Sequence, residues 1–137
     1  MSKSIFNDFA NKYYHVEYKT KTGEILKGDF KFTPEMTRRE AFQADSARRN
    51  IIGSLPPGQD APASLQAEAY MVGQLSIRVK DAPTWWVESD SGLEFSDAGV
   101  IAAVFDQLQL MEDEIRSLLN EKANESASTA KTKAEKS

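Results

Sequence analysis

The sequence contains no cysteine, one histidine and no long hydrophobic run. Without cysteine the chain has no disulfide framework, no thiolate nucleophile and no zinc site with sulfur ligands. The single histidine, His15, removes any two-histidine metal pair and argues against a catalytic triad. A membrane-spanning helix needs about 18 or more consecutive apolar residues, and no stretch approaches that length. These absences exclude a membrane span and most kinds of metal or nucleophile site.

The charge balance is weakly acidic, with 17 basic and 21 acidic residues and a net charge of −4. Nucleic-acid binding proteins usually carry a basic excess or a basic patch, so we expect no nucleic-acid partner. The arginine pairs at 38–39 and 48–49 lie among acidic residues, which indicates a salt-bridged helix surface. The first residues lack the apolar core of a signal peptide, so we expect a cytoplasmic protein.

Sequence motifs for catalysis or cofactor binding are also missing. Neither the P-loop pattern nor the glycine pattern of dinucleotide-binding proteins occurs. The acidic residues at 106 and 112–114 fit the solvated face of a helix better than a catalytic pair. We therefore predict no catalytic residue, no cofactor and no metal ion, and a protein that is not an enzyme.

The stretch from Ser96 to about residue 122 carries the strongest structural signal. Its large apolar residues are spaced three and four apart, which places them on one stripe of an α-helix. They are Ile101, Val104, Leu108, Met111, Ile115 and Leu118. Ser96 and Asp97 are suitable N-terminal caps, so the pattern predicts a helix over 97–122. We expect the rest of the chain to pack against this helix.

The N-terminal third predicts a short helix over 4–12 and then a β-hairpin over 13–33. Tyr14, Val16 and Tyr18 alternate with polar residues, and a second alternating run follows Gly23, which suits a turn. An isolated hairpin is marginally stable in water, so its aromatic face is expected to cover the helices.

Two further helices are predicted over 34–52 and 64–79, joined by a proline-rich loop at 53–63. Thr33, Pro34 and the acid that follows favour the start of the first helix, and Gly53 favours its end. The last residues of the second helix also alternate like a strand, so its end stays open. Phe42 lies on the charged face of the first helix, where it either packs under the hairpin or contacts a partner.

Trp85 and Trp86 are adjacent and must point in different directions. Either one ring enters the core while the other covers it at the surface, or the exposed ring anchors a partner. Which ring is exposed stays open. From residue 123 no large apolar residue occurs, which predicts a disordered tail over 123–137. The predicted fold is α+β and mainly helical: a single domain over 1–122 with an N-terminal hairpin and about three helices.

Three stretches carry a resemblance to a known family. They are Gly28-Asp29-Phe30-Lys31-Phe32-Thr33-Pro34, the run from Leu75 to Trp86 that ends Pro-Thr-Trp-Trp, and Gly92-Leu93-Glu94-Phe95-Ser96-Asp97. Their order over residues 26–122 resembles the tail assembly chaperones of long-tailed bacteriophages. The hairpin before Thr33 departs from that family, which is mostly helical.

The resemblance implies a protein of the host cytoplasm that coats the tape measure protein, keeps it soluble and helps to recruit tail tube subunits. Many such chaperones are also made in a longer, frameshifted form. The other readings are a structural component of the virion tail, tube-associated or terminator, and a helical adaptor that forms homo-oligomers through its apolar stripe. The residues expected to contact a partner are Phe42, Trp85, Trp86, Leu108, Met111, Ile115 and Leu118.

Overall fold

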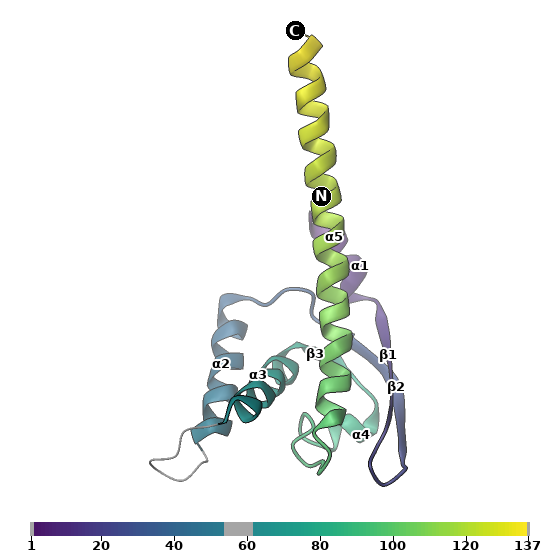
Figure 1. Ribbon diagram of the computed structural model, residues 1–137, viewed down its shortest axis with the longest axis vertical. Helices are drawn as coiled ribbons and strands as arrows, with labels where there is room; N and C mark the ends of the chain where they lie inside the picture. The colour runs from purple at the N-terminus through teal and green to yellow at the C-terminus, as the bar shows by residue number, and fades with distance from the viewer. Residues whose placement is uncertain (1, 54–61, 137) are drawn as a thin grey trace.

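The computed structural model describes the backbone of residues 2–53 and 62–136, and the side chains of residues 6–53 and 62–125. The elements follow one another as α1 (Ser2–Ala10), β1 (Tyr13–Lys19), β2 (Ile25–Phe32), α2 (Arg38–Gly53), α3 (Ala63–Arg78), β3 (Val79–Asp81), α4 (Thr84–Val87) and α5 (Gly99–Lys136). This is the predicted α+β fold, mainly helical, with the hairpin at its N-terminal end (Figure 1).

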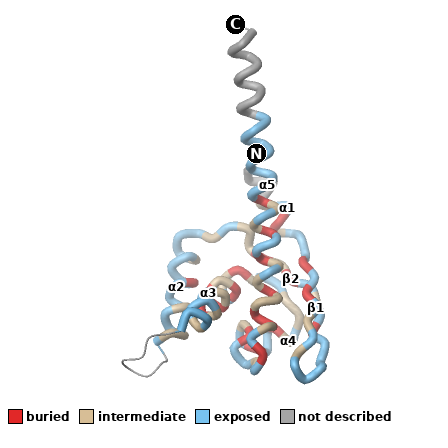
Figure 2. The backbone as a smooth tube through the Cα atoms, in the orientation of Figure 1, coloured by how far each residue is buried: buried red, intermediate tan, exposed pale blue. Residues whose placement is uncertain are grey.

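Helix α5 is the axis of the molecule, with the sheet on one side and α2 and α3 on the other (Figure 1). The predicted apolar stripe faces the core, because Ile101, Val104, Leu108, Met111 and Ile115 are all buried. Leu118 has the same spacing but is 39% exposed. Helix α5 extends well past the sheet and past α2 and α3 (Figure 2). The next two turns, residues 119–125, are also exposed.

The end of α5 differs from the prediction. We expected the helix to stop at 122 and a disordered tail to follow, whereas α5 continues to Lys136. Neither glycine nor proline interrupts the chain between Val100 and Lys136, and this segment is rich in alanine, lysine and glutamate, which favour helix. Low apolar content therefore predicted exposure correctly as far as residue 125, but it did not predict the backbone conformation.

Asp97 caps α5 and also ties the hairpin to it. Its Oδ1 accepts a hydrogen bond from the Gly99 backbone N–H at 3.0 Å, and Oδ2 accepts one from the Lys21 N–H at 3.1 Å. The Tyr18 hydroxyl donates to the same carboxylate at 3.0 Å. The Gly99 N–H, followed by Tyr18 and Lys21, lowers the pKa of Asp97 by favouring its charged form. The predicted cap is confirmed at Asp97, while Ser96 is exposed.

Acidification is expected to weaken the fold through Asp97. Its pKa in the folded protein lies below the unfolded value of about 3.9, so its stabilising effect is complete above that pH and is lost as the pH falls through the folded pKa. Urea unfolding from about pH 7 to about pH 2 should show Asp97→Asn less stable than the wild type at neutral pH, with a gap that closes in acid. The exposed Asp106→Asn on the same helix is the control. A gap that stays constant with pH would contradict this role.

The predicted hairpin is confirmed, with β1 and β2 antiparallel and Gly23 in the turn at a φ of +93°. The register pairs Tyr14 with Phe30 and Tyr18 with Leu26, and these side chains face α5 together with Phe32. Their neighbours along each strand face solvent, as the alternation predicted. Phe30 and Phe32 are completely buried, so the aromatic face covers the helices as expected.

A third strand, β3, begins where the predicted helix over 64–79 was expected to end. Helix α3 stops at Arg78, and Val79 pairs with Phe32 of β2. The strand-like alternation at the end of the predicted helix is thereby explained. The sheet order is β1-β2-β3, so β1 and β3 are the edges.

Helix α2 starts four residues later than predicted. The Glu40 N–H donates to the Thr37 hydroxyl at 3.1 Å, and the Thr37 N–H donates to the Glu40 carboxylate at 3.0 Å. This reciprocal pair is a capping box, and its sequence, Thr-Arg-Arg-Glu, outweighs the competing start at Pro34. Residues 33–37 instead form a connection between β2 and α2.

Helix α2 packs on α3 through small residues. Ala44 is buried in this contact, and it lies against Gly73 of α3. A Cβ atom at position 73 would stand 2.6 Å from the Ala44 carbonyl oxygen. The missing side chain therefore lets the two backbones approach closely.

Gly73→Ala is expected to lower the free energy of unfolding by about 1–3 kcal/mol, because the added methyl group must push the α2 backbone away. Gly53→Ala is the matched control, since nothing lies within 4 Å of the position its Cβ would take. Alanine there should be neutral or stabilise α2 by up to about 1 kcal/mol. Urea unfolding measures both. Equal stability of the two variants would mean that the α2–α3 contact is loose.

Candidate partner-binding surface

Four of the seven residues expected to contact a partner are buried. Leu108, Met111 and Ile115 lie under the sheet and the surrounding helices, and Trp86 lies beside them in the same core cluster. The width of the apolar stripe suggested both a core and a partner surface, but the hairpin, α1 and α3 pack against most of the stripe. These four residues therefore hold the fold together, and at 6% exposure or less they offer little surface of their own to a partner.

The tryptophan pair divides as one of the two interpretations predicted. Trp86 is 3% exposed and meets Phe30 edge to face at 5.6 Å between ring centroids. Trp85 is partly buried, also meets Phe30 edge to face at 5.6 Å, and donates its indole N–H to the Lys27 carbonyl at 3.0 Å. That carbonyl belongs to the part of β2 that the short β3 does not reach. Trp85 thus covers a sheet edge.

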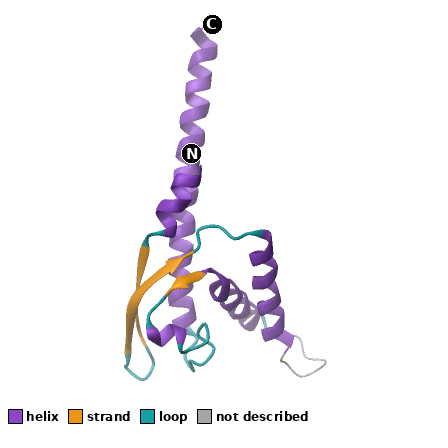
Figure 3. Ribbon diagram, turned by 180° about the vertical axis from the view of Figure 1, so that it is seen from behind, coloured by secondary structure: helices purple, strands orange, loops and turns teal. Residues whose placement is uncertain are grey.

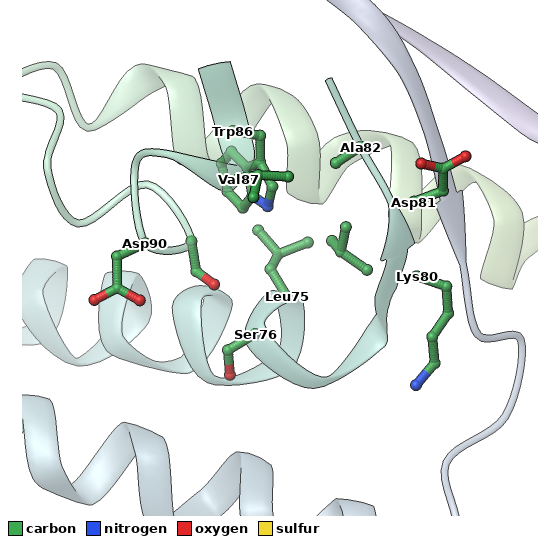
Figure 4. A pocket seen from close by; sticks show the side chains of 10 residues that line it. Leu75, Ser76, Lys80, Asp81, Ala82, Trp86, Val87 and Asp90 are labelled. Atoms are coloured by element: carbon green, nitrogen blue, oxygen red, sulfur yellow. The ribbon is translucent and has the colours of Figure 1, made fainter. Parts of the chain in front are cut away.

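A small cavity of about 220 Å³ lies beside Trp86, at the end of α3 (Figure 4). Leu75, Trp86 and Val87 supply its apolar side chains, while Lys80 and Asp90 lie on its rim. The turn beside it is unusual, because Asp90 and the residue after it both have positive φ angles, of 54° and 56°. The polar groups around this cavity do not converge on a common point in Figure 4.

Phe42 does not pack under the hairpin. It is 66% exposed on α2, and α2 lies on the opposite side of α5 from β1 and β2 (Figure 1). The Arg38 guanidinium lies over its ring at 5.8 Å. The role of Phe42 as a contact for a partner stays a prediction.

Two neighbouring exposed leucines and the hollows beside them form an apolar surface on α5, close to α1. Leu118 and Leu119 are each 39% exposed there. A hollow of about 430 Å³ on one side of α5 includes Leu119, and one of about 380 Å³ on the other side includes Leu118. We call this region the exit surface. Its apolar residues are Phe6, Phe9, Met36, Ile115, Leu118 and Leu119.

Charges of both signs border the exit surface. The Lys12 ammonium group bonds to the Glu114 carboxylate at 2.9 Å, and Arg116 bonds to Asp113 at 3.2 Å. The Tyr14 hydroxyl also donates to Glu114, at 3.2 Å. Burial, followed by this neighbouring carboxylate, raises the pKa of Tyr14 well above its usual value. An apolar floor with a mixed charged rim is the arrangement that binds an amphipathic helix.

Arg78 fixes the position of the loop beside the larger hollow. Its guanidinium donates to the Thr33 carbonyl at 3.0 and 3.1 Å and to the Pro34 carbonyl at 3.1 Å. A further nitrogen pairs with the Glu112 carboxylate on α5. This buried arginine holds the chain around Met36 against α5, and so sets the width of the hollow.

Sequence reasoning found Ile115 and Leu118 but missed the other contributors to the exit surface. Phe6, Phe9, Met36 and Leu119 are not among the residues that the sequence led us to expect as partner contacts. The available signal was the pair of phenylalanines in the short first helix, Phe6 and Phe9, which lie on one side of it. No periodicity indicates that α1 and the loop before α2 meet the same part of α5.

Among the residues that the structure describes, no three acidic or histidine side chains come together as a metal site. Within the same residues, no helix combines the length and apolar character needed to cross a membrane.

No family model matches this sequence, and no curated protein or solved structure matches it either. A functional proposal therefore depends mainly on the exit surface, together with the resemblance described for residues 26–122.

Proposed function

We propose that this protein is a tail assembly chaperone of a long-tailed bacteriophage, which acts by binding and not by catalysis. It binds apolar helical segments of the tape measure protein in the host cytoplasm, keeps them soluble and helps to recruit tail tube subunits. The observation that supports this best is the exit surface, where two adjacent exposed leucines lie between two hollows, each lined by apolar and charged side chains.

The exit surface has the chemistry that a tape measure helix requires. A long apolar helix needs a partner that buries its apolar face and leaves its polar face in water. Leu118 and Phe9 would contact one flank of such a helix, and Leu119 and Met36 the other. The charged side chains of Arg116 and Glu112 at the rim would fix its orientation. Many copies along one long ligand bind by avidity, so each contact can be weak.

Leu118→Asp combined with Leu119→Asp is expected to weaken binding of a soluble fusion that carries tape measure helices by about tenfold or more, because a charge would replace the centre of the apolar contact. Leu110→Asp is the matched control. Leu110 lies on the same helix at 48% exposure and lines none of the described hollows. Binding is measured by titration calorimetry, with circular dichroism to show that both variants fold. Equal loss in the control would contradict binding at the exit surface.

A permanent place in the virion tail is the alternative, since an apolar surface also suits a lasting contact. Mass spectrometry of purified particles beside the lysate that produced them separates the two. We expect the protein to be abundant in the lysate and absent from the particles. Stoichiometric presence in particles would contradict the chaperone role.

An adaptor that self-associates through the long apolar stripe is not supported, because Leu108, Met111 and Ile115 are already buried within one chain.

A further inference from the structure

Strand β1 forms an open edge of the sheet. It is the outermost strand in the order β1-β2-β3, and among the described residues no other strand pairs with its outer side. Helix α1 precedes β1 but packs against α5 and β2, so it does not run along that edge. Figure 3 shows the hairpin at the margin of the molecule, away from α2 and α3. Trp85 covers part of the opposite side of the sheet, but β1 has no comparable cover.

The backbone groups on the outer side of β1 follow from the hairpin register. The Thr20 N–H donates to the Glu24 carbonyl at 2.8 Å, and bonded pairs alternate with non-bonded pairs in an antiparallel ladder. Even-numbered residues of β1 therefore bond to β2. The N–H and C=O groups of residues 13, 15, 17 and 19 point away from it. The hydrogen bond between Trp85 and Lys27 supports this assignment of inward and outward groups. Lys27 is opposite Glu17, and its carbonyl likewise points away from the β1–β2 ladder.

The side chains at these four positions of one copy are complementary to those at the same positions of a second copy. In an antiparallel pair of β1 strands centred on Val16, residue 13 is opposite residue 19, and residue 15 is opposite residue 17. His15 would then meet Glu17 of the second copy, and Tyr13 would meet Lys19. All four side chains lie on the exposed face of the sheet. The same chemistry already operates within the hairpin, where His15 bonds to Asp29 at 2.9 Å and Lys31 lies over the Tyr13 ring at 5.3 Å.

The neighbouring registers are less favourable. Pairing centred on residue 15 would place two copies of His15 opposite each other, and pairing centred on residue 17 would place two copies of Glu17 together. Like groups directly opposite in a sheet repel or gain nothing, whereas opposite charges and cation–aromatic pairs stabilise it. Pairing centred on Tyr18 would also join opposite charges, Glu17 to Lys19, but it engages only two of the four outward residues of β1. The register centred on Val16 engages all four.

We propose that two copies of this chain pair antiparallel through β1, centred on Val16, and form one continuous six-stranded sheet about a two-fold axis. The partner is a second copy of the same chain. This inference is independent of the proposed function, because β1 and the exit surface are different parts of the molecule and the dimer requires no ligand.

The first test is the mass of the full chain in solution by sedimentation equilibrium at about 0.1 mM. We expect twice the chain mass of 15.3 kDa for the wild type. Glu17→Pro removes an outward N–H without removing a bond to β2, so it should yield a folded monomer. Glu17→Gln keeps that N–H and loses only the charge, so it should remain a weaker dimer. A monomeric wild type, or a dimer that Glu17→Pro leaves intact, would overturn the proposal.

Cysteine cross-linking tests the register without depending on a proline variant, and the chain has no cysteine of its own. A mixture of His15→Cys and Glu17→Cys chains should give mainly the mixed disulfide on oxidation, because these positions are opposite each other only in the proposed register. Preferential disulfides between two His15→Cys chains or between two Glu17→Cys chains would overturn it. The absence of any β1 cross-link would do the same.

Discussion

Replacing Trp86 with alanine is expected to lower the free energy of unfolding by about 3–5 kcal/mol. The ring is almost completely buried and meets Phe30 and Trp85 edge to face, at 5.6 and 6.4 Å between centroids. Gly92 also lies against it, since a Cβ there would stand 3.2 Å from the indole ring. Alanine would leave a cavity at the point where β2, α4 and α5 meet, and the surrounding elements cannot all move in to fill it.

Trp85→Phe is the comparison variant for Trp86→Ala. Phenylalanine keeps a ring against Phe30 and Phe95 but loses the hydrogen bond to the Lys27 carbonyl, so the loss should be about 1 kcal/mol. Urea unfolding followed by circular dichroism is suitable, because each variant changes the fluorescence itself. If Trp86→Ala kept full stability and lost only partner binding, Trp86 would be a recognition residue and its place in the core would be wrong.

Arg78→Ala is expected to lower the free energy of unfolding by about 3 kcal/mol or more. The Arg78 side chain is 5% exposed, and its guanidinium bonds to the carbonyls of Thr33 and Pro34 and to the Glu112 carboxylate. Removing it leaves buried carbonyl groups without their donor and a carboxylate without its counter-charge. Each such group costs about 1–3 kcal/mol when it is not satisfied by water.

Glu112→Gln separates the charge pair from the rest of this network. The Glu112 side chain is 40% exposed, so water can replace part of the lost interaction, and we expect a loss of less than about 1 kcal/mol. Unfolding measurements on both variants test the contrast. Equal losses would mean that the ion pair, and not the bonds to Thr33 and Pro34, accounts for the effect of Arg78. Because Arg78 also lines the larger hollow, its replacement should weaken binding at the exit surface as well.

The elements that the sequence predicted well are those whose signal is local. The stripe from Ile101 to Ile115 and the alternation around Val16 each repeat with the period of one element, and each appears where it was expected. The start of α2 was also present in the sequence, as the Thr-Arg-Arg-Glu capping box, but Pro34 offered a competing start. The hydrogen bonds of Thr37 and Glu40 decide between these two signals.

Other features depended on contacts between distant parts of the chain. Strand β3 exists because Val79 pairs with Phe32, which lies far away in sequence. Because Trp85 and Trp86 are adjacent, their side chains must point in different directions, but this did not determine which ring enters the core. Pro83 packs against Gly28, where even a Cβ atom would stand 2.6 Å from the proline ring, and this contact places Trp85 on the sheet edge.

The sequence by itself determined the long apolar helix, the hairpin and the absence of any metal or nucleophile motif, because periodicity and composition act over a few neighbouring residues. Only the tertiary structure decided which part of the apolar stripe is core and which part is surface. Met111 and Leu118 lie seven residues apart and have equivalent places in the repeat, yet one is buried and the other exposed. The reason is that burial depends on what packs against a residue, and the sheet and α3 cover α5 only as far as Ile115.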